Sequence, residues 1–212
     1  MAKPGRRSGA KRNEPAGEKR DRIIEAAFEA LRDEGFAHAS ARSIAARGGF
    51  NSALIFYYFD SVNDLLIEAL ARSSKTQLQQ YEAALGAVDS FPQLVEAVQA
   101  RLHDDMGSGH VRVLAELVGA SSSDEQLQRA VLEQVKPWID FTERTLTRVL
   151  DGNGLGGLVP PAQLSFVVVS LFLGMELLTG IAGDDQLIDG LFSSARQLAT
   201  LAEAFLPAGG QP

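Results

Sequence analysis

The sequence contains no cysteine and only three histidines, which are scattered along the chain. A disulfide is therefore impossible, and no group of residues has the spacing of a metal site. The run Gly152–Gly157 follows a helical pattern rather than a strand and lacks the Lys-Ser/Thr ending of a phosphate-binding loop, so it indicates a linker. We expect no metal, no cofactor and no enzymatic activity.

Long apolar runs are also missing, since no stretch of about 20 uninterrupted apolar residues occurs. The amino terminus lacks the apolar centre of a secretory signal. These absences predict a cytoplasmic protein that does not cross a membrane.

Helical patterning occupies almost all of the chain, and no alternating strand pattern appears. Apolar residues recur with helical spacing from Glu18 to Glu34, where Gly35 ends the pattern. Glycine, proline and serine clusters separate further helices, expected near residues 74–88, 91–106, 110–121, 124–151, 161–181 and 185–206.

Two short helical patterns flank Gly48-Gly49 inside the segment Ser40–Asp64. Ser40 is a good N-cap for the first, and Asn51 is suited to cap the second. The two glycines permit the positive φ angles of a tight turn between them. This layout is typical of a helix-turn-helix that inserts its second helix into the major groove of DNA.

The second short helix carries large side chains on both faces. Ile55 and Phe59 lie four residues apart and share one face, whereas Ala53, Leu54 and Tyr57 are expected to project the other way. Burial alone explains such a helix poorly, so we expect one face to meet a partner. Another helix follows, because Ser61 and Asp64 have the spacing of a capping box.

Residues 23–70 resemble the DNA-binding domain of the TetR family of one-component transcriptional regulators. The resemblance has no gaps and rests on these positions, in chain order: Gly35-Phe36, Ser40, Ile44-Ala45, Gly49-Phe50, Ile55-Phe56-Tyr57-Tyr58-Phe59, Ser61-Val62 and Leu65. Val62 and Tyr58 stand where family members commonly have a Lys and a His that bind phosphates. The resemblance therefore implies a motif that holds the DNA backbone less firmly than usual.

The resemblance and the helix-turn-helix layout together indicate which residues contact DNA. Arg42 occupies a position from which family members often reach DNA, and guanine is the natural partner of an arginine. The candidate DNA-binding residues are Ser40, Arg42, Asn51, Ser52, Ala53, Leu54, Phe56, Tyr57 and Tyr58.

Residues 1–17 form a basic stretch without apolar periodicity, which we expect to be disordered. Its cations are Lys3, Arg6, Arg7, Lys11 and Arg12. They suit an arm that lies in the minor groove beside the recognition helix, although a merely solubilising tail has the same composition. The first 72 residues carry a net charge of +2 and the remainder −9, so the positive potential lies where DNA would bind.

Residues 161–181 are apolar nearly all round, so a helix there must be covered on every side. Pairing it and the last helix with their symmetry mates gives an intermolecular four-helix bundle, an arrangement that the family resemblance also implies. Burial of both helices within a monomer is the alternative. The candidate interface residues are Phe166, Leu173, Leu177, Leu191, Leu198 and Leu201.

The central helices combine apolar residues with isolated polar groups, as small-molecule pockets do. Glu176 stands out because it interrupts an apolar run and must be paired, protonated or at an interface. We interpret His103-Asp104-Asp105 as a solvated helix end. The candidate pocket residues, each of which could instead be ordinary core or surface, are Leu102, His103, Met106, Leu117, Trp138, Phe141, Thr142, Phe166, Ser170 and Glu176.

The sequence thus predicts an all-α protein with an amino-terminal three-helix helix-turn-helix domain and a helical ligand-binding and dimerisation domain. The expected boundaries are a basic arm at 1–17, the DNA-binding domain at 18–66, the second domain at 67–206 and a disordered tail at 207–212. We expect a homodimeric repressor, released from a palindromic double-stranded DNA operator by a small-molecule effector. A helical adaptor with a vestigial helix-turn-helix is the alternative.

Overall fold

A computed structural model describes residues 15–152, 160–182 and 186–205. The described residues form helices joined by short turns and contain no strand, which confirms the all-α expectation. The helices are α1 (Ala16–Glu34), α2 (Ala41–Gly48), α3 (Ala53–Tyr58), α4 (Val62–Leu85), α5 (Phe91–Met106), α6 (His110–Ala120), α7 (Glu125–Gly152), α8 (Pro161–Ala182) and α9 (Gln186–Phe205), with 3-10 turns at Phe36–His38 and Ser121–Ser123. The tail expected at 207–212 and residues 1–14 of the basic arm lie outside the described residues. The expectation of disorder is wrong for Ala16 and Gly17, which are the first residues of α1.

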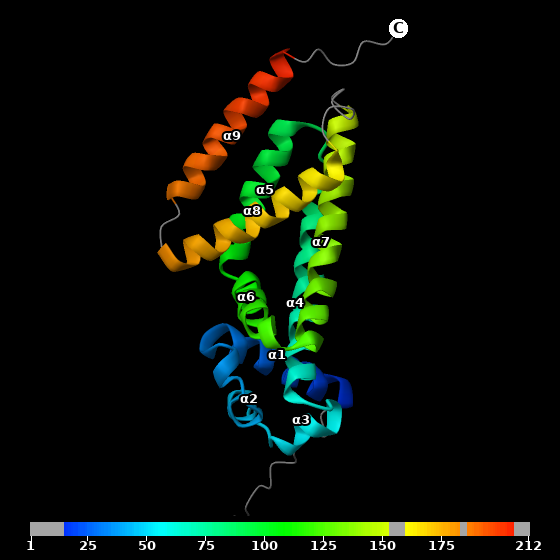
Figure 1. Cartoon of the computed structure of the whole chain (residues 1–212), viewed down its shortest axis with the longest axis vertical. Helices are drawn as coiled ribbons and strands as arrows, with labels where there is room; N and C mark the ends of the chain where they lie inside the picture. Colours follow the sequence, from blue (N-terminus) through cyan, green and yellow to red (C-terminus); the bar gives the residue numbers. More distant parts are fainter. Residues whose placement is uncertain (1–14, 153–159, 183–185, 206–212) are drawn as a thin grey trace, which may run out of the picture.

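The helices form two lobes that share long elements (Figure 1). The amino-terminal lobe consists of α1, α2, α3 and the first turns of α4. The carboxy-terminal lobe consists of the rest of α4 together with α5 to α9. In it α7 packs against α4 and α8, and α9 packs against α5. Helix α8 crosses the face of this lobe diagonally (Figure 1).

The turn between α2 and α3 has the expected caps and one unexpected detail. Ser40 Oγ accepts a hydrogen bond from the Ser43 N–H at 3.2 Å, and Asn51 Oδ1 accepts one from the Ala53 N–H at 2.9 Å. Only Gly49 adopts a positive φ, of 68°, whereas Gly48 is helical. The expectation that both glycines need positive φ is therefore wrong. A Cβ at Gly48 would lie 2.1 Å from the Phe50 ring, so this glycine permits close packing instead.

Helix α4 runs unbroken for 24 residues. The expectation of a new helix near residue 74 is wrong, because no glycine or proline occurs between Ser61 and Gly86 to end the first one. A domain boundary after residue 66 falls inside this helix. The two lobes are thus joined by a rigid element rather than by a linker.

The buried core of the amino-terminal lobe continues into the carboxy-terminal lobe. Ile23, Leu31 and Ile55 from α1 and α3 share one cluster with residues from more distant helices. These further members include Val113, Leu114 and Leu117 from α6 and Leu127 and Val131 from α7. The first three helices therefore complete their core only against the carboxy-terminal lobe.

Candidate DNA interface and effector cavity

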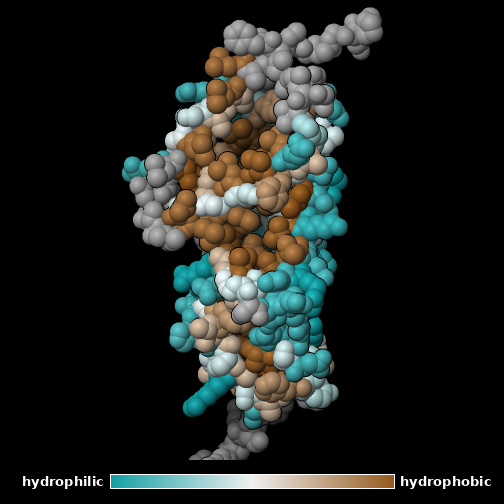
Figure 2. All heavy atoms as spheres, viewed as in Figure 1, coloured by the Kyte–Doolittle hydropathy of each residue, from teal (hydrophilic) through white to brown (hydrophobic). Residues whose placement is uncertain are grey.

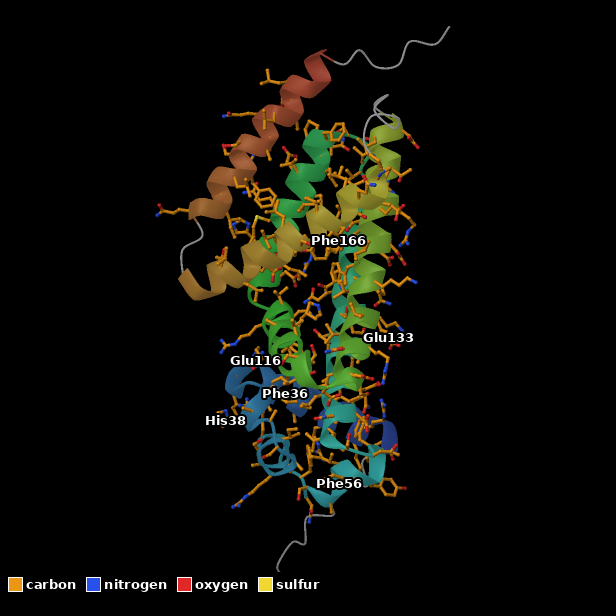
Figure 3. The ribbon with its side chains drawn as sticks, viewed as in Figure 1. Phe36, His38, Phe56, Glu116, Glu133 and Phe166 are labelled. Atoms are coloured by element: carbon orange, nitrogen blue, oxygen red, sulfur yellow. The ribbon has the colours of Figure 1, made fainter. Side chains whose placement is uncertain are left out.

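Helix α3 presents two aromatic side chains to solvent. Tyr57 is 78% exposed and Phe56 is 57% exposed, whereas Ile55 and Phe59 are buried, as the spacing predicts. Figure 3 shows Phe56 at the outer end of the amino-terminal lobe. Exposed aromatic residues at a lobe end whose core is already filled indicate a surface that contacts a partner.

Leu54 departs from the expectation that it projects away from the core. Leu54 and Tyr58 are both half-buried and pack against the core of the lobe. They lie four residues apart beside Ile55 and Phe59, so all four form one buried stripe. Ala53, Phe56 and Tyr57 remain as the outward face of this six-residue helix.

The two arginines of α2 have different surroundings. Arg47 makes ion pairs with Asp33 and Glu34 of α1, each at 2.7 Å, and these hold α2 against α1. Arg42 is exposed and makes no ion pair or hydrogen bond with any described residue. Arg42 is therefore the arginine of α2 whose guanidinium remains available to a partner.

The helix caps use two of the other predicted DNA-binding side chains. Ser40 Oγ and Asn51 Oδ1 already accept backbone hydrogen bonds at the starts of α2 and α3. Both residues and Ala53 are exposed, while Ser52 is half-buried. The residues of this set that lie at least partly at the surface of the helix-turn-helix are Ser40, Arg42, Asn51, Ser52, Ala53, Phe56 and Tyr57. Lys3, Arg6, Arg7, Lys11 and Arg12 lie outside the described residues.

The carboxy-terminal lobe contains a cavity of about 190 Å³. Most of its wall is apolar, and the polar residues that line it come from four different helices. The lining residues are Tyr81, Leu85, Leu94, Val98, Asp105, His110, Val111, Leu114, Val135, Trp138, Phe141, Thr142, Thr145, Leu146, Val168, Val169, Phe172 and Leu173. Trp138, Phe141 and Thr142 were expected there.

Several residues expected at the pocket lie elsewhere. Leu102 packs under α9 with Ile188 and Phe192. Leu117 faces the amino-terminal lobe instead, as part of its core.

The other displaced residues are on the surface. Phe166 (Figure 3) is exposed on α8. Ser170 is exposed on the same helix. His103 lies beside Asp189 of α9, with 3.4 Å between Nε2 and Oδ1. The side chain of Met106 is outside the described residues. The sequence therefore predicted several pocket residues at the wrong positions along their helices. Apolar spacing shows which side of a helix is buried, but it does not show which neighbouring element covers that side.

Aromatic rings form one side of the cavity. The Tyr81 ring meets Trp138 and Phe172 edge to face, with centroids 5.2 Å and 5.8 Å apart. The Trp138 Nε1–H donates to Ser74 Oγ at 3.0 Å, which fixes the indole. His110 is buried beside Trp138, and burial lowers its pKa to about 4, so the imidazole is neutral at pH 7.

Asp105 is a buried carboxylate at the cavity wall. Its side chain is 2% exposed, whereas that of Asp104 is 72% exposed, so the expectation of a solvated helix end is wrong for Asp105. Burial raises the pKa of Asp105, and the nearby Arg101 guanidinium opposes this rise. The sequence did indicate that Asp105 is buried, because Asp105 follows Val98 by seven residues and therefore lies on the same inward side of the helix.

Glu176 is the second buried acid in this region. It lies one turn beyond Phe172 on the inward face of α8, and its Oε1 atom is buried without a described hydrogen-bond partner. Burial, together with the nearby Asp105 carboxylate, raises the pKa of Glu176 to about 8. The sequence identified Glu176 as unusual; it is not among the residues that line the cavity, although it lies near Asp105, which does.

Helix α6 connects the cavity with the amino-terminal lobe. His110, Val111 and Leu114 at its start line the cavity. Glu116, one turn later, accepts a hydrogen bond from the Phe36 N–H through Oε2 at 2.9 Å (Figure 3). The sequence does not reveal this contact, because the two residues are 80 positions apart in the chain.

The candidate interface residues of α8 and α9 are mostly on the surface. Phe166, Leu177, Leu191, Leu198 and Leu201 are all exposed in the single chain, as an interface requires. Leu173 instead lines the cavity. Figure 2 shows hydrophobic residues gathered over α8 and towards α9, while the α7 edge is hydrophilic.

Helix α8 also resembles a membrane span in composition. Pro161–Thr179 is apolar and long enough to cross a bilayer, although a single such helix is weak evidence for a span. Among the described helices, α8 is the one that is both long enough and apolar enough to cross a bilayer.

The raised pKa of Glu176 predicts a dependence of stability on pH. In the unfolded chain this carboxyl ionises near its model value of 4.5, but in the folded protein it stays protonated to about pH 8. Folding then takes up a proton between these values, so stability falls as pH rises through this window, by up to about 1.4 kcal/mol per pH unit. We expect Glu176→Gln to unfold in urea as wild type does near pH 4, and at higher urea concentration than wild type near pH 8.

Glu133→Gln is the matched control, because Glu133 is exposed on α7 (Figure 3). This substitution should leave the pH dependence of the free energy of unfolding unchanged. His110, with its lowered pKa, contributes in the opposite direction below pH 6.5, so only the difference between variant and wild type reports on Glu176. If the free energy of unfolding changed with pH in the same way for wild type and Glu176→Gln between pH 5 and pH 8, the raised pKa of Glu176 would be contradicted.

Comparison with known proteins relates both lobes to transcriptional regulators. Residues 23–69 match the family described as bacterial regulatory proteins, tetR family. The HTH-type transcriptional regulator BetI of Escherichia coli O45:K1 is 30% identical over 123 residues, which cover 58% of this chain and 53% of BetI. The chain therefore spans about half the length of the curated relatives it matches.

Solved structures share the fold over most of the chain. Reduced NemR from E. coli has a TM-score of 0.69 at 13% identity and covers 90% of this chain and 99% of its own. FadR from Bacillus subtilis, in complex with stearoyl-CoA, has a TM-score of 0.67 at 18% identity, with coverages of 84% and 96%. The helix-turn-helix geometry and the family match lead to one conclusion: residues 23–69 form a DNA-binding domain of the TetR family of bacterial regulatory proteins, within a fold that solved regulators of that kind share over most of the chain.

Proposed function

We propose that this protein is a cytoplasmic DNA-binding transcriptional regulator, and specifically a repressor released from a palindromic operator by a small-molecule effector. The observation that carries the proposal is the outward face of α3, where exposed Phe56 and Tyr57 stand at the end of a lobe with a filled core. The unpaired Arg42 on α2 supplies a cation at the same end. The family consists of regulatory proteins, so catalysis has no part in the proposal.

In the DNA complex, each exposed group has a contact suited to its chemistry. Arg42 donates to guanine O6 and N7 in the major groove. Tyr57 donates its hydroxyl to a phosphate, and Ala53 meets a thymine methyl group. Ser40 and Asn51 act mainly as helix caps that hold α2 and α3 in register.

The basic arm contributes affinity that the motif lacks. Val62 packs against the core and supplies no cation to the backbone. The arm's Lys and Arg residues replace that contact in the adjacent minor groove.

Deleting residues 1–14, which precede α1, should therefore flatten the plot of log affinity against log salt. The expected change is roughly one unit of slope per lost phosphate contact. Fluorescence anisotropy with labelled operator DNA measures this slope. An unchanged slope would exclude phosphate contacts by the arm.

The effector acts from the cavity through α6 and α4. Both helices contribute to the cavity wall and to the core of the amino-terminal lobe. A ligand that fits one arrangement of these helices better than the other shifts the population between DNA-binding and released states.

A helical adaptor with a vestigial helix-turn-helix is the competing function. The specific observation in its favour is the absence of cations on α3, whose sequence is Ala53–Tyr58. DNA titrations separate the two functions, because an adaptor shows no salt-dependent DNA binding.

Arg42→Ala should weaken binding to DNA from upstream of the protein's own gene by about tenfold or more, because a bidentate guanine contact is worth about 1–3 kcal/mol. Arg129→Ala is the matched control, since Arg129 is an exposed arginine on α7 that pairs only with Glu125. Anisotropy titrations at two salt concentrations measure both variants.

The thermal stability of Arg42→Ala should match wild type, because Arg42 contacts no described residue through its guanidinium. Equal affinities for the two variants would refute the role of Arg42. The absence of wild-type binding to any upstream fragment, even at low salt, would favour the adaptor instead.

The homodimer buries the apolar surface of α8 and α9 and places two α3 helices on successive major grooves. Phe166→Glu and, separately, Leu198→Glu should convert a dimer to monomers, because each puts a charge into an apolar interface. Leu132→Glu, at a 67% exposed position on α7, should leave the dimer intact. Sedimentation equilibrium measures the mass, and a wild-type monomer at micromolar concentration would overturn this part of the proposal.

A further inference from the structure

At the cavity wall and close to it lies a group of buried polar atoms that lack hydrogen-bond partners among the described residues. These buried atoms are the Tyr81 hydroxyl, Asp105 Oδ1, Glu176 Oε1 and Arg101 Nε. Tyr81 and Asp105 line the cavity, and Asp105 is 2% exposed. Buried polar atoms without partners cost stability, so a concentration of them beside a cavity points to a ligand that satisfies them.

The charges in this group favour a cation over an anion. Arg101 is the cation among them, and its guanidinium is already engaged: Nη1 donates to Asp104 at 3.2 Å and Nη2 to Gln77 at 3.2 Å. Its distance to Asp105 Oδ1 is 3.7 Å, too long for a hydrogen bond. Asp105 therefore has one nearby arginine, which is largely committed to other partners, and the buried Glu176 carboxyl has no ion pair with a described residue.

The aromatic residues strengthen this preference. Tyr81, Trp138 and Phe172 stand edge to face around the cavity, and the faces of aromatic rings attract cations. Arg101 lies over the Tyr81 ring at 5.5 Å, which shows that this ring already accepts a cation on one side. Most of the remaining cavity wall is apolar.

We propose, on the basis of the regulator function above, that the effector carries a cationic nitrogen on a small apolar body, with the nitrogen beside Asp105 and Glu176 and the body against Trp138 and Phe141. The cation makes the ionised form of both carboxyls favourable, so binding releases a proton from Glu176 near neutral pH. A cavity of about 190 Å³ is below the usual 300–1,000 Å³ of drug-sized ligand sites, which limits the apolar body to roughly one ring.

Three probes of similar size and different charge test this assignment. They are 2-phenylethylammonium, neutral 2-phenylethanol and anionic 3-phenylpropanoate, each titrated calorimetrically into the full chain at pH 7. We expect the ammonium probe to bind at least tenfold more tightly than the other two. Titrations in buffers of different ionisation enthalpy should also detect proton release with the ammonium probe alone.

Glu176→Gln tests the role of the carboxyl without destabilising the fold, because it removes a costly buried acid. This variant should lose most of the preference for the ammonium probe and all of the proton release, while its affinity for 2-phenylethanol stays the same. Glu133→Gln, at an exposed position of α7, should behave as wild type.

Two results would overturn the proposal: equal or tighter binding of the neutral or anionic probe, or no binding of the ammonium probe at millimolar concentration. An unchanged preference in Glu176→Gln would exclude Glu176 as the recognition group. DNA binding is measured separately without any probe. Failure of the regulator function therefore appears as a lack of DNA affinity, and failure of this inference as a lack of charge selectivity.

Discussion

Helix α6 packs between two buried surfaces, the core of the amino-terminal lobe and the cavity wall. Val113, Leu114 and Leu117 complete the core of the amino-terminal lobe, while His110 and Leu114 line the cavity. Protein cores are close-packed, so α6 cannot shift for one surface without disturbing the other. The position of the helix-turn-helix and the shape of the cavity are therefore linked by geometry.

Two further features limit how the lobes can move. Helix α4 is continuous from Val62 to Leu85, so a displacement at its cavity end is carried to the helix-turn-helix. The Glu116 carboxylate holds the Phe36 N–H directly after α1. An effector that separates the α4 and α6 walls would alter both connections, and it changes DNA affinity only as far as it binds the two arrangements differently.

The sequence predicted the helices well and their contacts less well. Helices α5 to α9 begin and end within one residue of the expected positions, because glycine, proline and serine clusters interrupt the apolar spacing there. Spacing also identified Ile55 and Phe59 as buried. Spacing could not show that Arg47 is held in ion pairs while Arg42 is not, because the partners of Arg47 lie on another helix. It also could not show that Leu102 packs under α9 and Leu117 in the core of the amino-terminal lobe. These distinctions depend on tertiary contacts between residues far apart in the sequence.

Coupling between the cavity and the helix-turn-helix can be measured in both directions, because thermodynamic linkage is reciprocal. A ligand that stabilises the free protein in a thermal-shift screen is first titrated into the protein alone and then into the protein saturated with operator DNA. We expect weaker ligand binding in the DNA complex, by the same factor by which the ligand weakens DNA binding. Equal ligand affinity in both titrations, for every ligand shown to occupy the cavity, would contradict it.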